Sequence, residues 1–385
     1  MSIKTALLLH HGGDGIRGTE ICLIQSARAL AGSGWRVVVC RNQPVMDVEL
    51  ATIPVAPRVL PLEFPELRLD GKDTAFPLVA YVRAVRALRR LVLELRPDVI
   101  YCSGGLPCQT AVPVGRMMRI PVLCHFHHPA IRREYFLWLV KFADKVVFPS
   151  EFTRSLSRRK ARIEGEVIYN GIDVERFQPT AQRDPSWRQR LGIDARAVVI
   201  GQVGALVDHK RPGMLLRAFA RIRAAAAHPL HLCVVGKGPL LEPLEALARE
   251  LDIRTRVSLV GSVPDVLPFY QHVLDINALV SREEGLGLAV IEGSACGLPA
   301  LVTDCTGLSE TVIPERTGLR FGLHDEAALD AHLLRLANDA TLRHRLGAAG
   351  REHARQTFAA ETYGRKIVAA AESLVRWQPQ PAPTV

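Results

Sequence analysis

Short apolar segments alternate with amphipathic segments along most of this chain. Val, Ile and Leu run almost continuously through the short segments, as at 3–10, 35–40 and 197–204. Such continuous runs are typical of strands buried on both faces of a parallel sheet, whereas half-exposed strands alternate. The same pattern predicts strands at 98–102, 121–126, 145–149, 231–236, 257–261, 276–280 and 299–303.

Helices are predicted between these strands, at 19–31, 76–95, 211–227, 240–251 and 358–375. Two such series in tandem predict an α/β protein with two doubly wound, Rossmann-like domains. Pro179 and Pro185 interrupt the periodicity between them. We expect an N-terminal domain over 1–178, a C-terminal domain over 179–357, a last helix over 358–376 that crosses back to the N-domain, and a disordered tail over 377–385. Because ligands bind beyond the carboxyl ends of parallel strands, we expect an active site in a cleft between the domains.

The composition indicates a soluble protein of the cytoplasm. Of its 385 residues 48% are hydrophobic and 23% charged, which excludes wholesale disorder. No apolar run approaches the roughly 20 residues that cross a bilayer, and the apolar N-terminal segment is too short for a signal peptide. The eight cysteines form no C-x-x-C pair and lie mostly in apolar runs, so we expect free thiols rather than disulfides or a zinc site.

The chain carries a formal net charge of +10, most of it in the first half. An anionic partner is therefore expected, such as a phosphorylated substrate or an anionic lipid, although a merely solvated basic surface explains the charge equally well. Nucleic acid is disfavoured as a partner, because the sequence has no zinc-finger spacing, no aromatic RNA-binding motif and no Lys/Arg tail.

A glycine-rich loop follows the first predicted strand. The segment from Gly13 to Gly18, GDGIRG, fits G-x-G-x-x-G, the dinucleotide-binding pattern. An NAD(P)-dependent oxidoreductase would also need an acidic residue near the end of the second strand, where this chain has Arg41 and Asn42. Arg41 suits NADP, so this class stays open as an alternative. The other interpretation is a loop, with Gly15, Gly18 and Glu20, that a substrate approaches closely.

The segment SREEGLGLAVIEGSACGLP, which begins at Ser281, carries the most informative chemistry. Glu284 and Glu292 are separated by seven residues, and Gly287 lies between them, just before a helix predicted to begin near Leu288. Free N–H groups and the positive end of the dipole make such a helix N-terminus a phosphate site. A carboxylate one turn into the helix can accept two hydrogen bonds from a ribose diol.

This segment resembles the E-x7-E signature of the retaining glycosyltransferases of family 4, which have the GT-B fold. Other segments agree with the family in order and spacing: the first glycine-rich loop, ADKVVFPS at 143–150, VIYNGIDVERF at 167–177, GQVGALVDHK at 201–210, VVGKGP at 234–239 and SETV at 309–312. Together they extend the resemblance over about residues 3–376.

The resemblance implies that a nucleoside-diphosphate sugar binds the C-terminal domain as a substrate, with no separate cofactor. Lys210 and the N–H groups of Gly287 and Leu288 would hold the diphosphate, Glu292 the ribose and Glu284 the donor sugar. Turns near Gly238 and Val263 would border the base. His127 matches the family's cleft histidine, with His125 or His128 as neighbours. The resemblance thus implies His127, Lys210 and Glu284 as catalytic residues.

Ala205 stands where the family usually has an arginine that assists the diphosphate. Arg211 and Arg282 are candidate substitutes; a binding protein with little catalytic activity is the second alternative. The sequence has no D-x-D motif, so we expect transfer without a metal ion. No carboxylate can be assigned as a nucleophile, and the family is often discussed as front-face attack with the leaving diphosphate as base.

The acceptor is expected on the basic N-terminal domain. On the predicted helix at 76–95, an apolar sector (Val79, Tyr81, Val85, Leu88, Leu91, Val92, Leu95) should oppose Arg83, Arg86, Arg89 and Arg90. Basic clusters also lie at 132–138 and 157–162. Such faces can contact anionic lipid, so we expect peripheral attachment to the inner face of the cytoplasmic membrane and a saccharide or lipid-linked acceptor in polysaccharide, exopolysaccharide or lipopolysaccharide assembly. A solvated helix face is the alternative.

Overall fold

The computed structural model describes residues 3–13, 15–16, 18–65, 77–127 and 132–376. The chain divides into two compact units, one of Met1–Gly171 with Ala360–Val385 and one of Ile172–Ala359. The division falls after Gly171, whereas the sequence placed it after Gln178. The segment at 172–178 belongs to the second unit because its residues bond there: Arg176 pairs with Asp265 at 2.7 Å. Residues 377–385, the expected disordered tail, lie outside the described residues.

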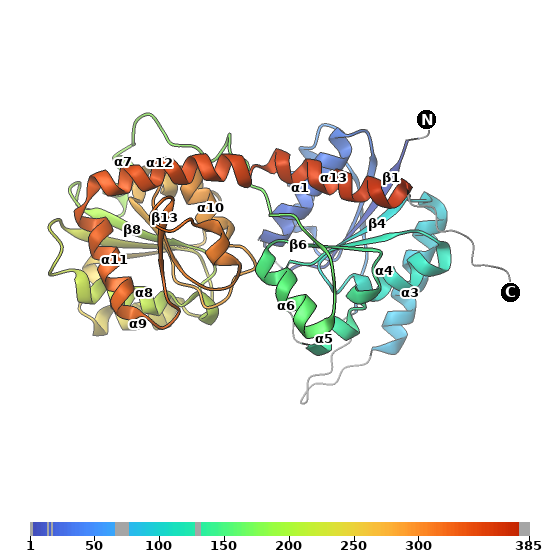
Figure 1. Ribbon diagram of the computed structural model, residues 1–385, viewed down its shortest axis with the longest axis horizontal. Coiled ribbons are helices and arrows are strands. Elements are labelled where there is room, and N and C mark those ends of the chain that lie inside the picture. The colour runs from blue at the N-terminus through green and yellow to red at the C-terminus, as the bar shows by residue number, and fades with distance from the viewer. Residues whose placement is uncertain (1–2, 14, 17, 66–76, 128–131, 377–385) are drawn as a thin grey trace. The chain divides into compact units, whose positions relative to one another are not determined.

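The first unit is built on a seven-stranded parallel sheet in the order β3-β2-β1-β4-β5-β6-β7 (Figure 1). Two of its strands, β3 and β7, were not expected from the sequence, since they are short and lie at the sheet's two edges. The strands are β1 (Thr5–His10), β2 (Arg36–Arg41), β3 (Arg58–Pro61), β4 (Val99–Ser103), β5 (Val122–His125), β6 (Lys145–Phe148) and β7 (Glu166–Val167).

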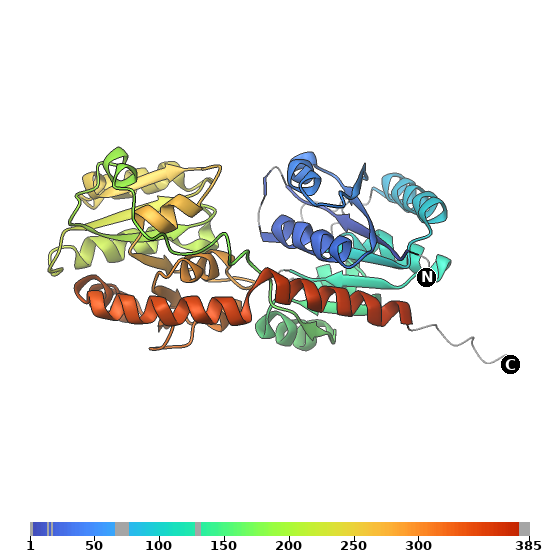
Figure 2. The ribbon, with the colours of Figure 1, turned by 90° about the horizontal axis from the view of Figure 1, so that it is seen from above.

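Alternate residues of these strands enter two separate cores. Ala6 and Leu8 of β1 pack under α1 and α13, whereas Leu7 and Leu9 pack under α3 and α4. Figure 2 shows α13 running alongside α1 on one side of the sheet. Both faces of the sheet are thus covered, which explains the continuous apolar runs. The helices are α1 (Gly18–Gly32), α2 (Asp47–Ala51), α3 (Leu78–Leu95), α4 (Cys108–Met118), α5 (Arg132–Leu137), α6 (Glu151–Ala161) and α13 (Ala360–Arg376), with 3-10 turns η1 (Pro44–Met46) and η2 (Val140–Phe142).

A buried hydrogen-bonded cluster fastens α13 to the first unit. The Tyr363 hydroxyl lies 2.7 Å from Ser26 Oγ of α1 and 3.3 Å from His125 Nδ1, and Tyr101 joins both groups at 3.1 and 2.8 Å. Burial lowers the pKa of His125 to about 3, so this imidazole is neutral at physiological pH. The helix expected at the end of the chain therefore belongs to the N-terminal unit through specific polar contacts as well as apolar packing.

The second unit has a six-stranded parallel sheet in the order β10-β9-β8-β11-β12-β13. Its strands are β8 (Val198–Val203), β9 (Leu230–Val235), β10 (Val257–Gly261), β11 (Ile276–Leu279), β12 (Ala300–Thr303) and β13 (Gly318–Phe321); β13 was not expected. The direction of winding reverses between β8 and β11, which is where doubly wound sheets bind ligands.

Helices cover both faces of this sheet too, around a core that includes Ile200, Phe219 and Leu333. Asp325 and Asp339 cap α11 and α12, each accepting a backbone N–H three residues on. The helices are α7 (Ser186–Arg190), α8 (Pro212–Ile222), α9 (Leu241–Glu250), α10 (Leu288–Ala295), α11 (Glu326–Asn338) and α12 (Ala340–Thr357). Short helical turns complete the unit: η3 (Asp208–Lys210), η4 (Arg254–Arg256), the π-helical η5 (Phe269–Val273) and η6 (Thr306–Thr311).

Two further expectations concern the chain as a whole. All eight cysteines are free thiols, and Cys305 alone among them is not fully buried, so the prediction of unpaired cysteines is confirmed. Within the described residues, no helix is both long and apolar enough to span a bilayer.

Candidate functional site

Lys210 and Glu284 meet at the carboxyl edge of the second sheet, on either side of its switch point. Lys210 ends η3, which follows β8, and Glu284 lies in the loop that follows β11. The Lys210 ammonium donates directly to Glu284 Oε1. The two side chains are only 19% and 10% exposed, so the pair is shielded from water and its attraction is stronger than that of a surface pair.

Neighbouring groups fix both members of this pair. Ser281 Oγ donates to Glu284 Oε1 at 2.7 Å, and the Gln202 amide donates to the Lys210 carbonyl at 3.1 Å. Gln202 is itself buried on β8, so the turn that carries Lys210 is bonded to the sheet. The sequence indicated both charged residues, but it gave no sign that they form an ion pair with each other.

Helix α10 begins beside this pair with a glycine in the left-handed conformation. Gly287 has φ = 100°, and a Cβ there would lie 2.7 Å from the Leu308 side chain, so only glycine fits without strain. Gly287 is the N-cap of α10, and Leu288 is its first residue. The first N–H groups of a helix have no intrahelical acceptor, and these can therefore bind an anion.

The turns expected near the base of a nucleotide lie at the same carboxyl edge. A Cβ at Gly238 would lie 2.3 Å from the Leu206 carbonyl oxygen, because this turn packs directly against the loop after β8. The Leu206 N–H donates to the Lys237 carbonyl at 2.9 Å, which fixes the two loops to each other. Val263 follows β10 and is partly exposed. The loops that follow β10, β9, β8 and β11 therefore lie in this order along the carboxyl edge of the second sheet.

Glu292 is buried one turn into α10. Its hydrogen-bond partner among the described residues is Tyr270, whose hydroxyl lies 3.1 Å from Glu292 Oε2 and 3.1 Å from the Ala289 carbonyl. Burial raises the pKa of Glu292 to about 7, although the hydrogen bond from Tyr270 and the charge of Arg176 oppose the rise. Such a carboxyl changes its charge near neutral pH, which is typical of functional sites. The sequence did not indicate Tyr270.

The two arginines considered as substitutes at the Ala205 position have other partners. Arg211 Nη1 donates to the Leu323 carbonyl at 2.8 Å, and Arg282 pairs with the exposed Asp208 at 2.9 Å. Lys210 is therefore the cation that the structure holds against Glu284. Among the residues described, no three His, Cys, Asp or Glu side chains converge as metal ligands would.

The carboxyl edge of the first sheet holds a second polar cluster, which the sequence revealed only in part. His10 Nε2, at the end of β1, lies 3.1 Å from Glu20 Oε1, and both side chains are 2% exposed. Burial alone would raise the pKa of Glu20, but the hydrogen bond and charge of His10 outweigh burial and lower that pKa. The sequence singled out Glu20, whereas His10 appeared only as the end of a strand.

The glycine that this cluster requires is Gly12. A Cβ at Gly12 would lie 2.4 Å from both Glu20 Oε1 and His10 Nε2, whereas no atom of the described residues lies within 4 Å of one at Gly15. Gly18 is the first residue of α1. That a substrate approaches the backbone at Gly15 and Gly18 stays a prediction.

The dinucleotide alternative lacks its second requirement. Asn42, at the position of the missing carboxylate, exchanges two hydrogen bonds of 2.9 Å with the Gly12 backbone. Arg41, the residue that suited NADP, forms a bidentate pair with Asp47 at 2.5 and 3.0 Å. Both side chains are thus engaged within the protein.

His127 lies beyond the end of β5, at the same edge as His10. Its Nε2 is 3.2 Å from Ser103 Oγ at the end of β4, and its ring centroid is 4.0 Å from that of His125. The side chain is only 4% exposed, so its imidazole is held in one orientation. His128, the other expected neighbour, lies outside the described residues.

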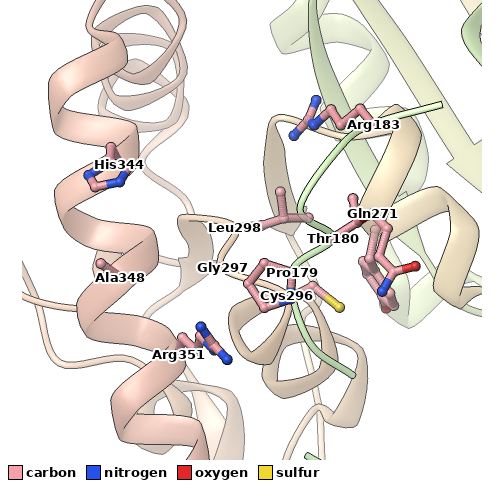
Figure 3. Close-up of a pocket in the computed structure, with 11 residues that line it drawn as sticks. Pro179, Thr180, Arg183, Gln271, Cys296, Gly297, Leu298, His344, Ala348 and Arg351 are labelled. Atoms are coloured by element: carbon pink, nitrogen blue, oxygen red, sulfur yellow. The ribbon is translucent and has the colours of Figure 1, made fainter. Parts of the chain in front are cut away.

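A separate cavity of about 310 Å³ lies in the second unit, at the C-terminal end of α10 (Figure 3). Arg351 extends toward it from α12, opposite Pro179 and Thr180. Tyr270 lines this cavity and also bonds Glu292. Lys210 and Glu284 are not among the lining residues, so the cavity is distinct from the site at the carboxyl edge.

Two family models match the chain in succession. One, described as Glycosyltransferase Family 4, matches residues 16–176, and the other, described as Glycosyl transferases group 1, matches residues 183–353. Together they include both polar edges described above, except His10 and Gly12.

Similar proteins include the GDP-mannose-dependent alpha-(1-6)-phosphatidylinositol monomannoside mannosyltransferase of Mycolicibacterium smegmatis, 29% identical over 73% of this chain and 78% of that protein. The D-inositol 3-phosphate glycosyltransferase of Salinispora arenicola is 32% identical over 49% of this chain and 45% of that protein. Among solved structures, Anabaena HepE in complex with UDP and glucose superposes with a TM-score of 0.81 at 19% identity, over 96% of this chain and 100% of that one. The last likeness confirms the GT-B fold.

Proposed function

The chain belongs to the family 4, group 1 glycosyltransferases, and from this premise we propose that it is a retaining enzyme that moves a hexosyl group from a UDP- or GDP-sugar to a saccharide or lipid-linked saccharide. The observation that carries the proposal is the shielded Lys210–Glu284 pair across the switch point, beside the N-terminus of α10. A GDP-mannose-dependent relative makes GDP-mannose the first donor to test.

The residues at this edge fit the charges that such a reaction creates. When the glycosidic bond breaks, negative charge grows on the departing diphosphate, and stabilising it is the main catalytic need. Lys210 and the N–H groups of Gly287 and Leu288 would neutralise that charge without a metal ion. Glu284 would hold Lys210 and contact the sugar hydroxyls, and Glu292 would bind the ribose. The polar edge with His10, Glu20 and His127 would face the acceptor.

The proposal is tested by measuring nucleotide release and sugar transfer by the purified full chain. We expect turnover with one of GDP-mannose, UDP-glucose, UDP-galactose or UDP-N-acetylglucosamine, retention of the anomeric configuration in the product, and activity that survives EDTA. UDP or GDP should also raise the melting temperature, whereas NADPH should not. Stabilisation by UDP or GDP without any turnover would favour the alternative of a binding protein, and stabilisation by NADPH alone would contradict the proposal.

Helix α3 supports a second part of the proposal, contact with anionic lipid. Successive 100° steps place Leu78, Val82 and Leu93 on the exposed face together with its arginines. Leu78 and Val79 are each 66% exposed, which corrects the expectation that Val79 lies in the apolar sector opposite the arginines. The exposed arginines are Arg83, Arg86, Arg89 and Arg90. Apolar and cationic groups on one exposed face are typical of helices that lie in a membrane interface.

We expect the purified protein to float with vesicles that contain anionic lipid and to dissociate at high salt. Replacing the four arginines of α3 by glutamine should reduce binding by at least tenfold, since each basic residue contributes about 1 kcal/mol near such a surface. The matched control replaces four exposed arginines of the second unit, Arg196, Arg217, Arg249 and Arg355, by glutamine. Equal binding to neutral and anionic vesicles, or equal loss in both variants, would contradict a role for α3.

A further inference from the structure

The backbone on both sides of the Lys210–Glu284 pair is in a conformation that ordinary residues avoid. Arg211, which follows Lys210, and Thr306, which bonds Glu284, both have φ = 52°. Arg211 has a routine reason for it, because it is the C-cap of η3, just as Arg96, Arg119 and Arg162 are the C-caps of α3, α4 and α6. Thr306 ends no helix; it opens η6 after β12.

Threonine is a poor choice for this conformation. Its branched Cβ crowds the backbone when φ is positive, so a β-branched residue there is a genuine outlier, whereas glycine adopts the conformation freely. Strain of this kind persists only where surrounding contacts impose it, and it gathers at functional sites. The contacts of Thr306 must therefore explain why its side chain is present.

Two of the hydrogen bonds at and beside Thr306 involve Glu284, while Ser309 Oγ donates to the Thr306 carbonyl at 2.9 Å and Thr306 Oγ1 donates to Cys305 Sγ at 3.8 Å. Thr306 Oγ1 accepts the Glu284 N–H at 3.0 Å, and the N–H of the next residue, Gly307, donates to the Glu284 carbonyl at 3.2 Å. The loop after β12 thus holds both peptide groups that flank the Glu284 side chain. A hydroxyl is needed for the first of these bonds, and glycine or alanine would not supply it.

We propose that Thr306 is a positioning residue for glycosyl transfer: its strained backbone brings its hydroxyl to Glu284 and thereby fixes the Lys210–Glu284 pair. This inference rests on the proposed function. Thr306 itself would touch neither donor nor acceptor. It acts through Glu284, whose carboxylate holds the Lys210 ammonium where the charge of the leaving diphosphate develops.

Three substitutions separate the hydroxyl from the strain. Thr306→Ser keeps the hydroxyl and should keep kcat/KM within about threefold of the parent. Thr306→Ala and Thr306→Gly both lose it and should lower kcat by about tenfold or more, with a smaller change in KM for the donor, because an interaction of the transition state is misplaced. Thr306→Gly should nevertheless melt roughly 2–4 °C higher than Thr306→Ala, since glycine relieves the strain.

Asp252→Gly is the matched control, because Asp252 has φ = 51° in the same unit and its side chain is 99% exposed. This variant should leave kcat unchanged.

Hydrogen exchange of the Glu284 amide gives a readout that does not depend on turnover: it should accelerate in Thr306→Ala and Thr306→Gly but not in Thr306→Ser. Full activity of Thr306→Gly, or an unaltered Glu284 amide in it, would overturn the inference. A parent protein without turnover would instead contradict the proposed function, and the amide readout would still decide whether the hydroxyl fixes Glu284.

Discussion

Replacing Lys210 by alanine should lower kcat/KM by about a hundredfold to a thousandfold while the protein still folds. Removing a single preorganised donor to a developing anion costs about this much. The variant also leaves Glu284, which is 10% exposed, without its cation, so that its carboxylate repels the donor diphosphate. Initial rates of nucleotide release measure the loss, and calorimetric titration with UDP or GDP measures the accompanying loss of affinity.

Lys366→Ala is a suitable control, since Lys366 is exposed on α13 in the other unit. Lys210→Arg should recover only part of the rate, because the planar guanidinium cannot replace a compact ammonium at one carboxylate oxygen. The double variant Lys210→Ala, Glu284→Ala should lose less in kcat/KM than the two single losses added together. The reason is that the two side chains act as a unit. Rates unchanged in Lys210→Ala would remove the basis of the proposed function.

Much of the fold could be predicted because its strands are buried on both faces. Burial on both faces leaves continuous apolar runs, and the central strands β1, β4, β8 and β9 were found in this way. The strands β3, β7 and β13 were missed because two to four residues at a sheet edge give little pattern. The domain boundary was misplaced because Pro179 marks a change of periodicity, whereas the division depends on tertiary contacts.

The candidate site was predicted less completely, for a different reason. Lys210, Glu284 and Glu292 lie in segments whose spacing is itself informative. Pairing is not visible in spacing: His10 with Glu20, and Tyr270 with Glu292, join residues whose partners depend on how loops fold at the edge of a sheet. A histidine at a strand end and a glycine two residues on are the sequence signals that could have indicated the first of these pairs.

Glu292→Gln should make the protein more stable at pH 8 and less active there. The pKa of Glu292 is raised by burial from an ordinary 4.5 to about 7, so the folded protein binds this proton more tightly than the unfolded chain does. Between these two values the folded state holds more protons, and its stability falls as the pH rises. Above pH 7 the ionised Glu292 carboxylate has lowered the free energy of unfolding by about 3 kcal/mol in total. The neutral glutamine does not cause this loss. Thermal or urea unfolding at pH 5 and pH 8 measures the difference, which should be small at pH 5.

The kcat/KM for the donor should change with pH in the opposite direction to the stability of the fold. Ribose hydroxyls donate to the carboxylate, and hydrogen bonds to a charged acceptor contribute about 1.5–3 kcal/mol each, so Glu292→Gln should lose about tenfold to a hundredfold in kcat/KM for the donor at pH 8. In the parent protein kcat/KM should rise with pH to a plateau above pH 7. Tyr270→Phe should move this rise to higher pH, because the Tyr270 hydroxyl lowers the pKa of Glu292. Glu250→Gln, on the exposed end of α9, should change neither quantity.

The opposite signs make this experiment decisive for the role of Glu292. Replacing a carboxylate that only supported the fold would lower both stability and activity. Replacing a carboxylate that binds a hydroxyl-rich ligand should lower activity but raise stability, because such a carboxylate destabilises the protein that carries it. A glutamine variant that is less stable at pH 8, or that binds UDP and GDP as tightly as the parent, would show that the carboxylate serves the packing of Tyr270 against α10 rather than the donor.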